Sequence, residues 1–220
     1  MQIFKQLRNQ QNCVLFFGGF GSHPSHFLPF IPKCYDCVML YNYTHLNFDA
    51  LLECLKALPK DSQITLIAFS MGVFVARIFR THYPLKLLKS FAINGTEYGI
   101  HPKYGIPEVL FKRTHQRFIT QTNALETFKK NLFAEQLETA CNFIFLEPKV
   151  LCNELEFFRE SCAKHQKITI PISWDFAWIS LRDLIINPNA QKHFWQEKDT
   201  TIITLDAPHF MFFNRNPLCP

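Results

Sequence analysis

The sequence of 220 residues has little charge, little glycine and no long apolar run. Charged residues make up 19% of the chain, and the net charge of +5 is too small to indicate binding to nucleic acid. The most apolar run, from Leu66 to Phe79, contains Ser70 and Arg77 and is too short to span a bilayer. We therefore expect neither a nucleic-acid partner nor a membrane partner.

A secretory signal and a metal site are also not expected. The first residues, MQIFKQLRNQQN, have no continuous apolar core. Eight cysteines in such a chain are interpreted as reduced, buried thiols of a cytoplasmic protein. Cys34 and Cys37 form a C-x-x-C pair, but a zinc site needs a second ligand pair, and the sequence has none at suitable spacing.

Apolar residues make up 48% of the chain, and short β-prone runs alternate with helical patterns. The predicted strands are Cys13–Phe17, Cys37–Tyr43, Ile64–Phe69, Leu87–Asn94, Phe176–Leu181 and Thr201–Asp206. The predicted helices are Phe48–Ala57, Val73–His82 and Asn189–Glu197. Nearly continuous apolar strands are typical of a parallel sheet buried on both faces. The alternation therefore predicts an α/β fold with a mostly parallel central sheet flanked by helices.

This alternation stops between Gly99 and His165, where the sequence has helical patterns and few strand-like runs. The stretch is too long for an ordinary crossover connection. We interpret residues 99–165 as a helical cap inserted into an α/β core formed by residues 1–98 and 166–220.

Ser70 lies where a predicted strand ends and a predicted helix begins, in the sequence AFSMG. The pattern resembles G-x-S-x-G, in which a tight strand-to-helix turn exposes a nucleophilic serine and requires small neighbours two residues away. Ala68 and Gly72 meet that steric requirement. A serine that caps the helix is an equally good interpretation of these five residues alone.

The scarcity of glycine favours the nucleophile. The chain has seven glycines, where average usage would give about 15. Three of them, Gly18, Gly19 and Gly21, directly follow a predicted strand. In the serine hydrolases with this pattern, such a loop and the residue after the nucleophile supply the two N–H groups of the oxyanion hole. We therefore predict Phe20 and Met71 as backbone donors; a plain turn is the alternative.

A catalytic serine needs a base and an acid that orients the base. His209 follows the last predicted strand, where the base is expected, and His23 and His26 are its main competitors.

Catalytic groups of open α/β sheets gather at the carboxyl ends of strands. Asp183 follows such an end, whereas Asp175 and Asp199 precede strands, and Asp206 is only three residues from the histidine. The prediction is a Ser70–His209–Asp183 triad that transfers an acyl group to water through an acyl-enzyme.

Four segments resemble the BioG family of pimeloyl-[acyl-carrier protein] methyl ester esterases. They are LFFGGFGSHPSHF, IAFSMG, DLIINPNAQKHFW and DAPHF. The resemblance spans the chain and implies an α/β-hydrolase fold, a pimeloyl methyl ester carried by acyl-carrier protein as the substrate, release of methanol, and no cofactor or metal. The sequence departs from the family at Phe20, where members often have tryptophan, and at Ala68, where they often have glycine.

Other functions remain open at this point. The same triad would serve another carboxylesterase or a thioesterase, and a hydrolase-fold protein that only binds a ligand is a further alternative.

The predicted cap has an uneven charge. Residues 101–130 contain six basic and two acidic residues, and residues 131–160 contain two basic and six acidic residues. Lys112, Arg113 and Arg117 are spaced to share a helical face. Because acyl-carrier proteins are acidic, the family resemblance implies that this face docks the carrier.

Overall fold

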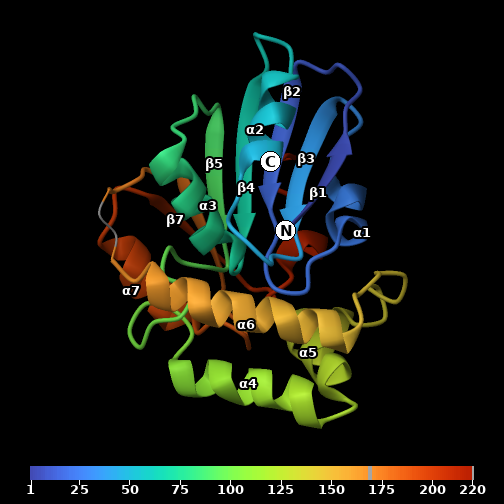
Figure 1. The fold of residues 1–220 in the computed structure, drawn as a ribbon, viewed down its shortest axis with the longest axis vertical. Coiled ribbons are helices and arrows are strands. Elements are labelled where there is room, and N and C mark those ends of the chain that lie inside the picture. Colours follow the sequence, from blue (N-terminus) through green and yellow to red (C-terminus); the bar gives the residue numbers. More distant parts are fainter. Residues whose placement is uncertain (168–169, 220) are drawn as a thin grey trace.

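In the computed structural model, which describes residues 1–167 and 170–219, seven strands form a single sheet in the order β1-β3-β2-β4-β5-β6-β7 (Figure 1). The strands are β1 (Gln2–Gln6), β2 (Asn12–Phe17), β3 (Tyr35–Tyr41), β4 (Gln63–Phe69), β5 (Lys89–Ile93), β6 (Phe176–Ser180) and β7 (Thr201–Leu205). β1 is antiparallel to β3, and every other neighbouring pair is parallel. The predicted fold class is confirmed.

Three of the helices match the predicted ones: α2 (Asp49–Lys56), α3 (Gly72–His82) and α7 (Pro188–Gln196). The six predicted strands are also present, with their ends shifted by at most two residues. β1 was not predicted. Its residues, QIFKQ, are mostly half-buried or exposed, as befits an edge strand, and they lack the apolar run that marks the central strands.

The two faces of the sheet are covered by different helices. Neighbouring side chains of a strand point to opposite faces, and β2 shows this clearly. Phe16 packs against Phe27 of α1 (Pro24–Phe27), with ring centroids 4.3 Å apart. Phe17 packs against Phe79 of α3 on the other face, with centroids 5.6 Å apart. These contacts place phenylalanine side chains in the core on both faces of the sheet.

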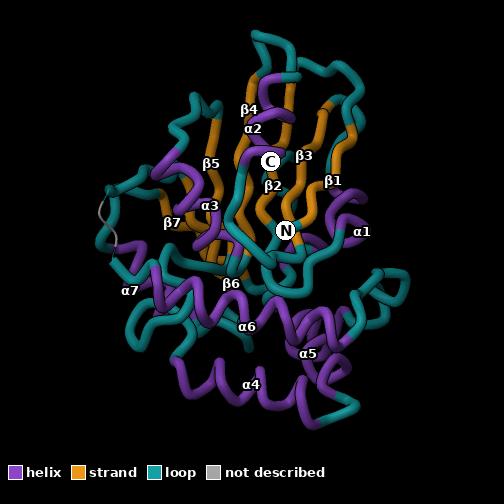
Figure 2. The backbone as a smooth tube through the Cα atoms, in the orientation of Figure 1, coloured by secondary structure: helices purple, strands orange, loops and turns teal. Residues whose placement is uncertain are grey.

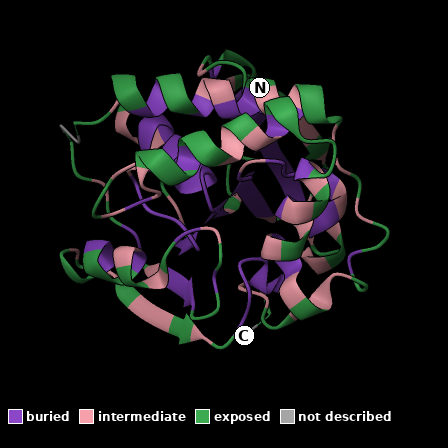
Figure 3. Cartoon of the chain, turned by 90° about the horizontal axis from the view of Figure 1, so that it is seen from below, coloured by how far each residue is buried: buried purple, intermediate pink, exposed green. Residues whose placement is uncertain are grey.

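Residues 99–165 form the helices α4 (Glu108–Thr120), α5 (Ala124–Phe133), η2 (Ala134–Gln136) and α6 (Pro148–Lys164). We call these residues the cap. The helices α4 and α6 run beneath one end of the sheet, and the connections after β2 and β4 reach that end (Figures 1 and 2). Seen from the cap side, the outer surfaces of the cap helices are mostly exposed (Figure 3).

The cap nevertheless has apolar side chains that face the core. Buried examples are Phe111, Phe118, Phe128, Leu132 and Phe133. The proposed division into a core and a cap remains a prediction, and residues 168, 169 and 220 of its second core segment lie outside the described residues. Within the described ranges, no helix is long and apolar enough to cross a membrane.

Candidate active site

Ser70 lies between the last residue of β4 and the first residue of α3, and its φ angle is +55°. A residue with a side chain seldom adopts this left-handed conformation, and such strain is common at functional sites. A Cβ atom on Gly72 would lie 2.2 Å from the carbonyl oxygen of Phe17, so this position requires glycine. The tight strand-to-helix turn expected from AFSMG is present, and Ser70 is only 5% exposed.

Asp183 and His209 form a buried pair. The Oδ2 atom of Asp183 lies 2.7 Å from Nδ1 of His209, and neither side chain is more than 1% exposed. An ionised carboxylate can only accept hydrogen bonds, so Nδ1–H of the imidazole donates to it. This tautomer leaves Nε2 without a proton, which is the state needed in a general base.

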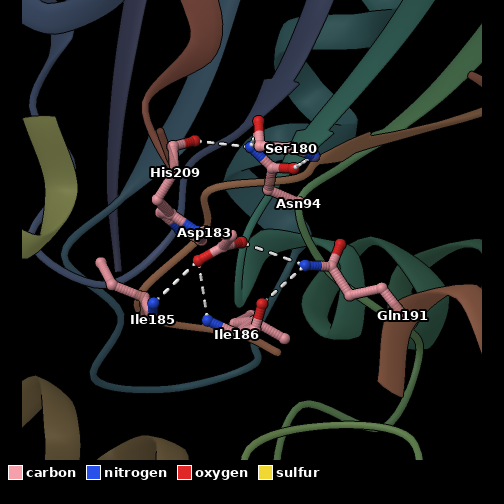
Figure 4. Close-up of polar contacts among 7 residues, drawn as sticks. All are labelled: Asn94, Ser180, Asp183, Ile185, Ile186, Gln191 and His209. Atoms are coloured by element: carbon pink, nitrogen blue, oxygen red, sulfur yellow. Dashed lines mark hydrogen bonds and ion pairs between the residues drawn. The ribbon is translucent and has the colours of Figure 1, made fainter. Parts of the chain in front are cut away.

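The other contacts of Asp183 fix its orientation (Figure 4). Its Oδ1 atom accepts the N–H groups of Ile185 and Ile186, at 2.8 and 2.9 Å. Its Oδ2 atom also accepts from Nε2 of Gln191, at 3.0 Å. Both oxygens therefore have two donors each. Gln191, which is fully buried on α7, was not predicted as a site residue, although it lies in the segment DLIINPNAQKHFW.

Asn94 holds the backbone of the histidine. Its Nδ2 atom donates to the carbonyl oxygen of His209 at 2.6 Å and to Oγ of Ser180 at 2.8 Å (Figure 4). The N–H group of Ser180 donates back to Oδ1 of Asn94 at 2.7 Å. Sequence reasoning missed Asn94; its position at the end of a buried strand was the one available signal.

The competing acids have other partners. Asp175 accepts hydrogen bonds from the backbone N–H and the hydroxyl of Ser90. Asp206 pairs with Arg182 at the surface, with Oδ1 2.7 Å from Nε. Asp199 lies just before β7, at an exposed position. Among these four acids, the described contacts bring only Asp183 to the imidazole.

The two competing histidines, His23 and His26, also have other partners. His26 is buried, and its Nε2 atom lies 2.6 Å from the carbonyl oxygen of Ile144. Burial lowers the pKa of His26 to about 3. His23 contacts the hydroxyl of Ser25 at 3.0 Å. Of the three candidate histidines, His209 alone lines the cavity that contains Ser70.

This cavity has a volume of about 220 Å³ and lies between the core and the cap. Ser70, Met71, His209 and Phe20 line it from the core. From the cap, apolar side chains of α4 and α5 line it, together with Arg113 and Arg117; these apolar residues are Leu110, Phe111, Phe118, Ala124, Phe128 and Leu132. The arrangement suits a ligand with an apolar chain.

The predicted oxyanion loop passes close to the serine. A Cβ atom on Gly19 would lie 2.6 Å from Cβ of Ser70 and 3.2 Å from its Oγ, so the loop can approach only because this residue is glycine. Within the described part of the chain, neither Phe20 nor Met71 donates its backbone N–H to another protein group. Both N–H groups are therefore available to a ligand.

The three predicted docking residues differ in their surroundings. Arg113 and Arg117 line the cavity, whereas Lys112 does not. Lys112 instead pairs with Glu108 one helical turn away, with 2.7 Å between Nζ and Oε1.

A family model described as "Pimeloyl-ACP methyl esterase BioG" matches residues 1–216. The chain belongs to the BioG family. The crystal structure of selenomethionyl BioG from Haemophilus influenzae is similar to it, with a TM-score of 0.86, 26% identity, and coverage of 98% of this chain and 97% of that one. An uncharacterized protein of Haemophilus influenzae is 27% identical over 207 residues, which are 92% of this chain and 90% of that protein.

A second relative of this BioG-family chain is longer. The protein named malonyl-[acyl-carrier protein] O-methyltransferase from Bacteroides fragilis is 28% identical over 203 residues, and the match covers 91% of this chain but 40% of that protein. A lipase-esterase related protein from Clostridium acetobutylicum has a TM-score of 0.63 at 14% identity, with 96% and 92% of the two chains covered. That likeness shows the fold alone, which is the α/β-hydrolase fold.

Proposed function

We propose that the chain is a serine carboxylesterase that hydrolyses the methyl ester of pimeloyl-[acyl-carrier protein], releasing methanol and the free carboxylate in biotin biosynthesis. The observation that supports it most is the buried Asp183–His209 pair, whose imidazole lines the same cavity as Ser70. The family match supports the substrate. No cofactor or metal has a role in this reaction.

The proposed mechanism assigns one role to each of Ser70, His209 and Asp183. Oγ of Ser70 attacks the ester carbonyl, and Nε2 of His209 accepts the hydroxyl proton. Asp183 holds the imidazole in the required tautomer and stabilises the imidazolium. The imidazolium then gives the proton to the departing methoxide, so methanol leaves and an acyl-enzyme remains. Water activated by the same imidazole hydrolyses the acyl-enzyme.

The negative charge that develops on the carbonyl oxygen needs donors. Phe20 and Met71 line the cavity that contains Ser70, and their backbone N–H groups lack protein acceptors in the described residues. Donors of this kind, fixed before the reaction, stabilise the tetrahedral intermediate without reorganisation. Since Phe20 contributes its backbone, the exchange of tryptophan for phenylalanine leaves this role intact.

The partner in the proposal is acyl-carrier protein, which bears the substrate. Arg113 and Arg117 lie on the cavity wall formed by α4, so an acidic partner bound there would deliver its acyl chain to the cavity. The name of the Bacteroides relative refers to O-methylation of a carrier-bound acid. That reaction yields a methyl ester on a carrier, which is the bond class proposed here. A cytoplasmic location fits the eight free cysteines.

The test is a mass measurement on the carrier. The purified protein is incubated with the methyl ester of pimeloyl-[acyl-carrier protein], and the carrier should change in mass from methyl ester to free acid. Ser70→Ala serves as the matched control and should leave the ester intact. Loss of the whole acyl group instead would identify a thioesterase. Failure of a fluorophosphonate probe to label Ser70 would favour a protein that only binds a ligand.

A further inference from the structure

Glu154 is a buried carboxylate that reaches from the cap into the core. It lies on α6 and is 0% exposed. Its Oε2 atom accepts the backbone N–H of Gly21 at 2.9 Å, and its Oε1 atom accepts the backbone N–H of Tyr43 at 2.9 Å. These donors are 133 and 111 residues away in sequence. One side chain of the cap therefore holds the loops that follow β2 and β3.

Such a group is costly to bury. In the part of the chain that the structure describes, no lysine, arginine or histidine side chain forms an ion pair with Glu154. A buried charge without a paired cation destabilises the fold unless hydrogen bonds replace its hydration. Burial raises the pKa of Glu154 to about 7, while the two N–H donors act in the opposite direction. The two N–H donors offset part of this cost, and an apolar side chain here would leave both N–H groups without an acceptor.

The contact with Gly21 lies next to the candidate oxyanion hole. Gly21 directly follows Phe20, and its φ of +67° turns the chain sharply at this point. On the other side of Phe20, Gly19 lies against Ser70. The peptide that carries the Phe20 N–H is thus fixed by Ser70 on one side and by Glu154 on the other.

We infer that Glu154 is a positioning residue, whose ionised carboxylate holds the loop from Gly19 to Gly21 so that the Phe20 N–H points at the reacting carbonyl oxygen. The inference rests on the proposed function, because it takes Phe20 as an oxyanion donor. It goes further by assigning a part of the catalytic geometry to the cap.

The charge state of Glu154 matters for this role. Both oxygens accept an N–H, so a protonated carboxyl would turn one oxygen into a donor that faces an N–H group. The nearby ionisable groups are the ammonium of Met1, which favours the ionised form, and the phenol of Tyr43, whose hydroxyl donates to the Leu40 carbonyl. Protonation of Glu154 should therefore release one of the two loops.

The experiment compares Glu154→Gln with Glu160→Gln, which removes the same charge from an exposed position of α6. With a small methyl ester, Glu154→Gln should lower kcat by about 100-fold and change KM by less than about twofold, as expected when an oxyanion donor is misplaced. The affinity for a boronate, which forms a tetrahedral adduct with Ser70, should fall by a similar factor. Binding of the carboxylate product should be unchanged, and Glu160→Gln should match the wild type.

The pH profile provides a second measurement. In the wild type, protonation of Glu154 should lower kcat by the factor of about 100 expected for Glu154→Gln, so the acid limb of log kcat against pH should be steeper in the wild type than in the variant over the two pH units below about 7. In Glu154→Gln this carboxyl is gone, and the additional steepness should be gone with it. Acid limbs of equal slope in the two proteins would overturn the inference. If Glu154→Gln does not fold, Glu154→Asp, which keeps the charge on a shorter side chain, should lower kcat and boronate affinity together, and wild-type values in Glu154→Asp would overturn the inference.

Other outcomes separate the two proposals. An equal loss of boronate and product binding, with an unchanged acid limb, would mean that Glu154 only stabilises the fold. Wild-type kcat in Glu154→Gln, together with an inactive Ser70→Ala, would overturn this inference alone. Activity that persists in Ser70→Ala would instead overturn the proposed function.

Discussion

The core edge that carries Ser70 and the cap that covers it differ in how they hold their polar groups. At the core edge, both oxygens of Asp183 are saturated by donors from one short segment and from His209. The cap surrounds the same cavity with apolar side chains, and its arginines stand at half-buried or exposed positions. In the proposed function, the core edge supplies the reacting groups and the cap side contacts the substrate.

The largest loss of activity is predicted for a substitution at the core edge. Ser70→Ala removes the proposed nucleophile, and turnover should fall by about 10⁶-fold, as in other serine hydrolases. The fold should remain, because the hydroxyl forms none of the described hydrogen bonds and alanine is as small. Steady-state hydrolysis and thermal unfolding of the variant check both points. Activity close to that of the wild type would show that Ser70 is not the nucleophile.

Asp183→Asn should have the second largest effect. The amide would offer its own donor to Nδ1 of His209, which favours the wrong tautomer, and turnover should fall by about 10⁴-fold. Asp206→Asn and Asp175→Asn are the matched controls, since their carboxylates bind Arg182 and Ser90. These variants should keep most of their activity. A crippling effect of Asp206→Asn would mean that the acid has been assigned incorrectly.

The sequence predicted the core side of the site because its signals are local. The strand ends, the small residues around Ser70 and the order of serine, acid and histidine are visible within short segments. The structure brings Asp183 and His209 together as expected, although their roles remain predictions. β1 was not predicted, because its five residues are partly polar and obtain their structure from pairing with β3.

The contribution of the cap could not be predicted in the same way. Glu154 appears in the sequence as one of six acids in residues 131–160, and only the fold shows that it faces two backbone N–H groups from distant loops. Asn94 was missed for the same reason, since its partners Ser180 and His209 come from distant segments, whereas Gln191 contacts Asp183 only eight residues away. Long-range contacts of polar side chains with backbone groups leave no periodic pattern in a sequence.

The third prediction concerns how the free energy of unfolding depends on pH, which is set by a carboxyl group of the cap. Burial in the folded protein raises the pKa of Glu154 from its ordinary value of 4.5 to about 7. Between these pH values the folded protein binds a proton that the unfolded chain has released, so the free energy of unfolding should fall as pH rises, by about 3 kcal/mol in all. Denaturant titrations at pH 5 and pH 8 check this slope. Glu154→Gln should lack it, and an equal slope in that variant would assign it to other groups.

The smallest change is predicted for substitutions of the basic residues of α4. Charge reversal by Arg113→Glu and Arg117→Glu should raise KM for the carrier-bound ester by about tenfold, because acidic carrier would no longer be attracted to α4. Lys112→Glu should do less, since Lys112 already pairs with Glu108. Lys60→Glu is the matched control, because Lys60 is exposed in the turn before β4, at the amino ends of the strands.

The salt dependence identifies the cause of this change in KM. Attraction between exposed charges weakens as ionic strength rises, so the wild type and the charge-reversed variants should become more alike in high salt. KM for a small methyl ester, which brings no carrier, should change much less than KM for the carrier-bound ester. Equal losses on both substrates would indicate a damaged cavity wall, since Arg113 and Arg117 line the cavity. Unchanged KM values on both would mean that the basic face of α4 is ordinary solvated surface, and that the carrier binds elsewhere on the cap or the core.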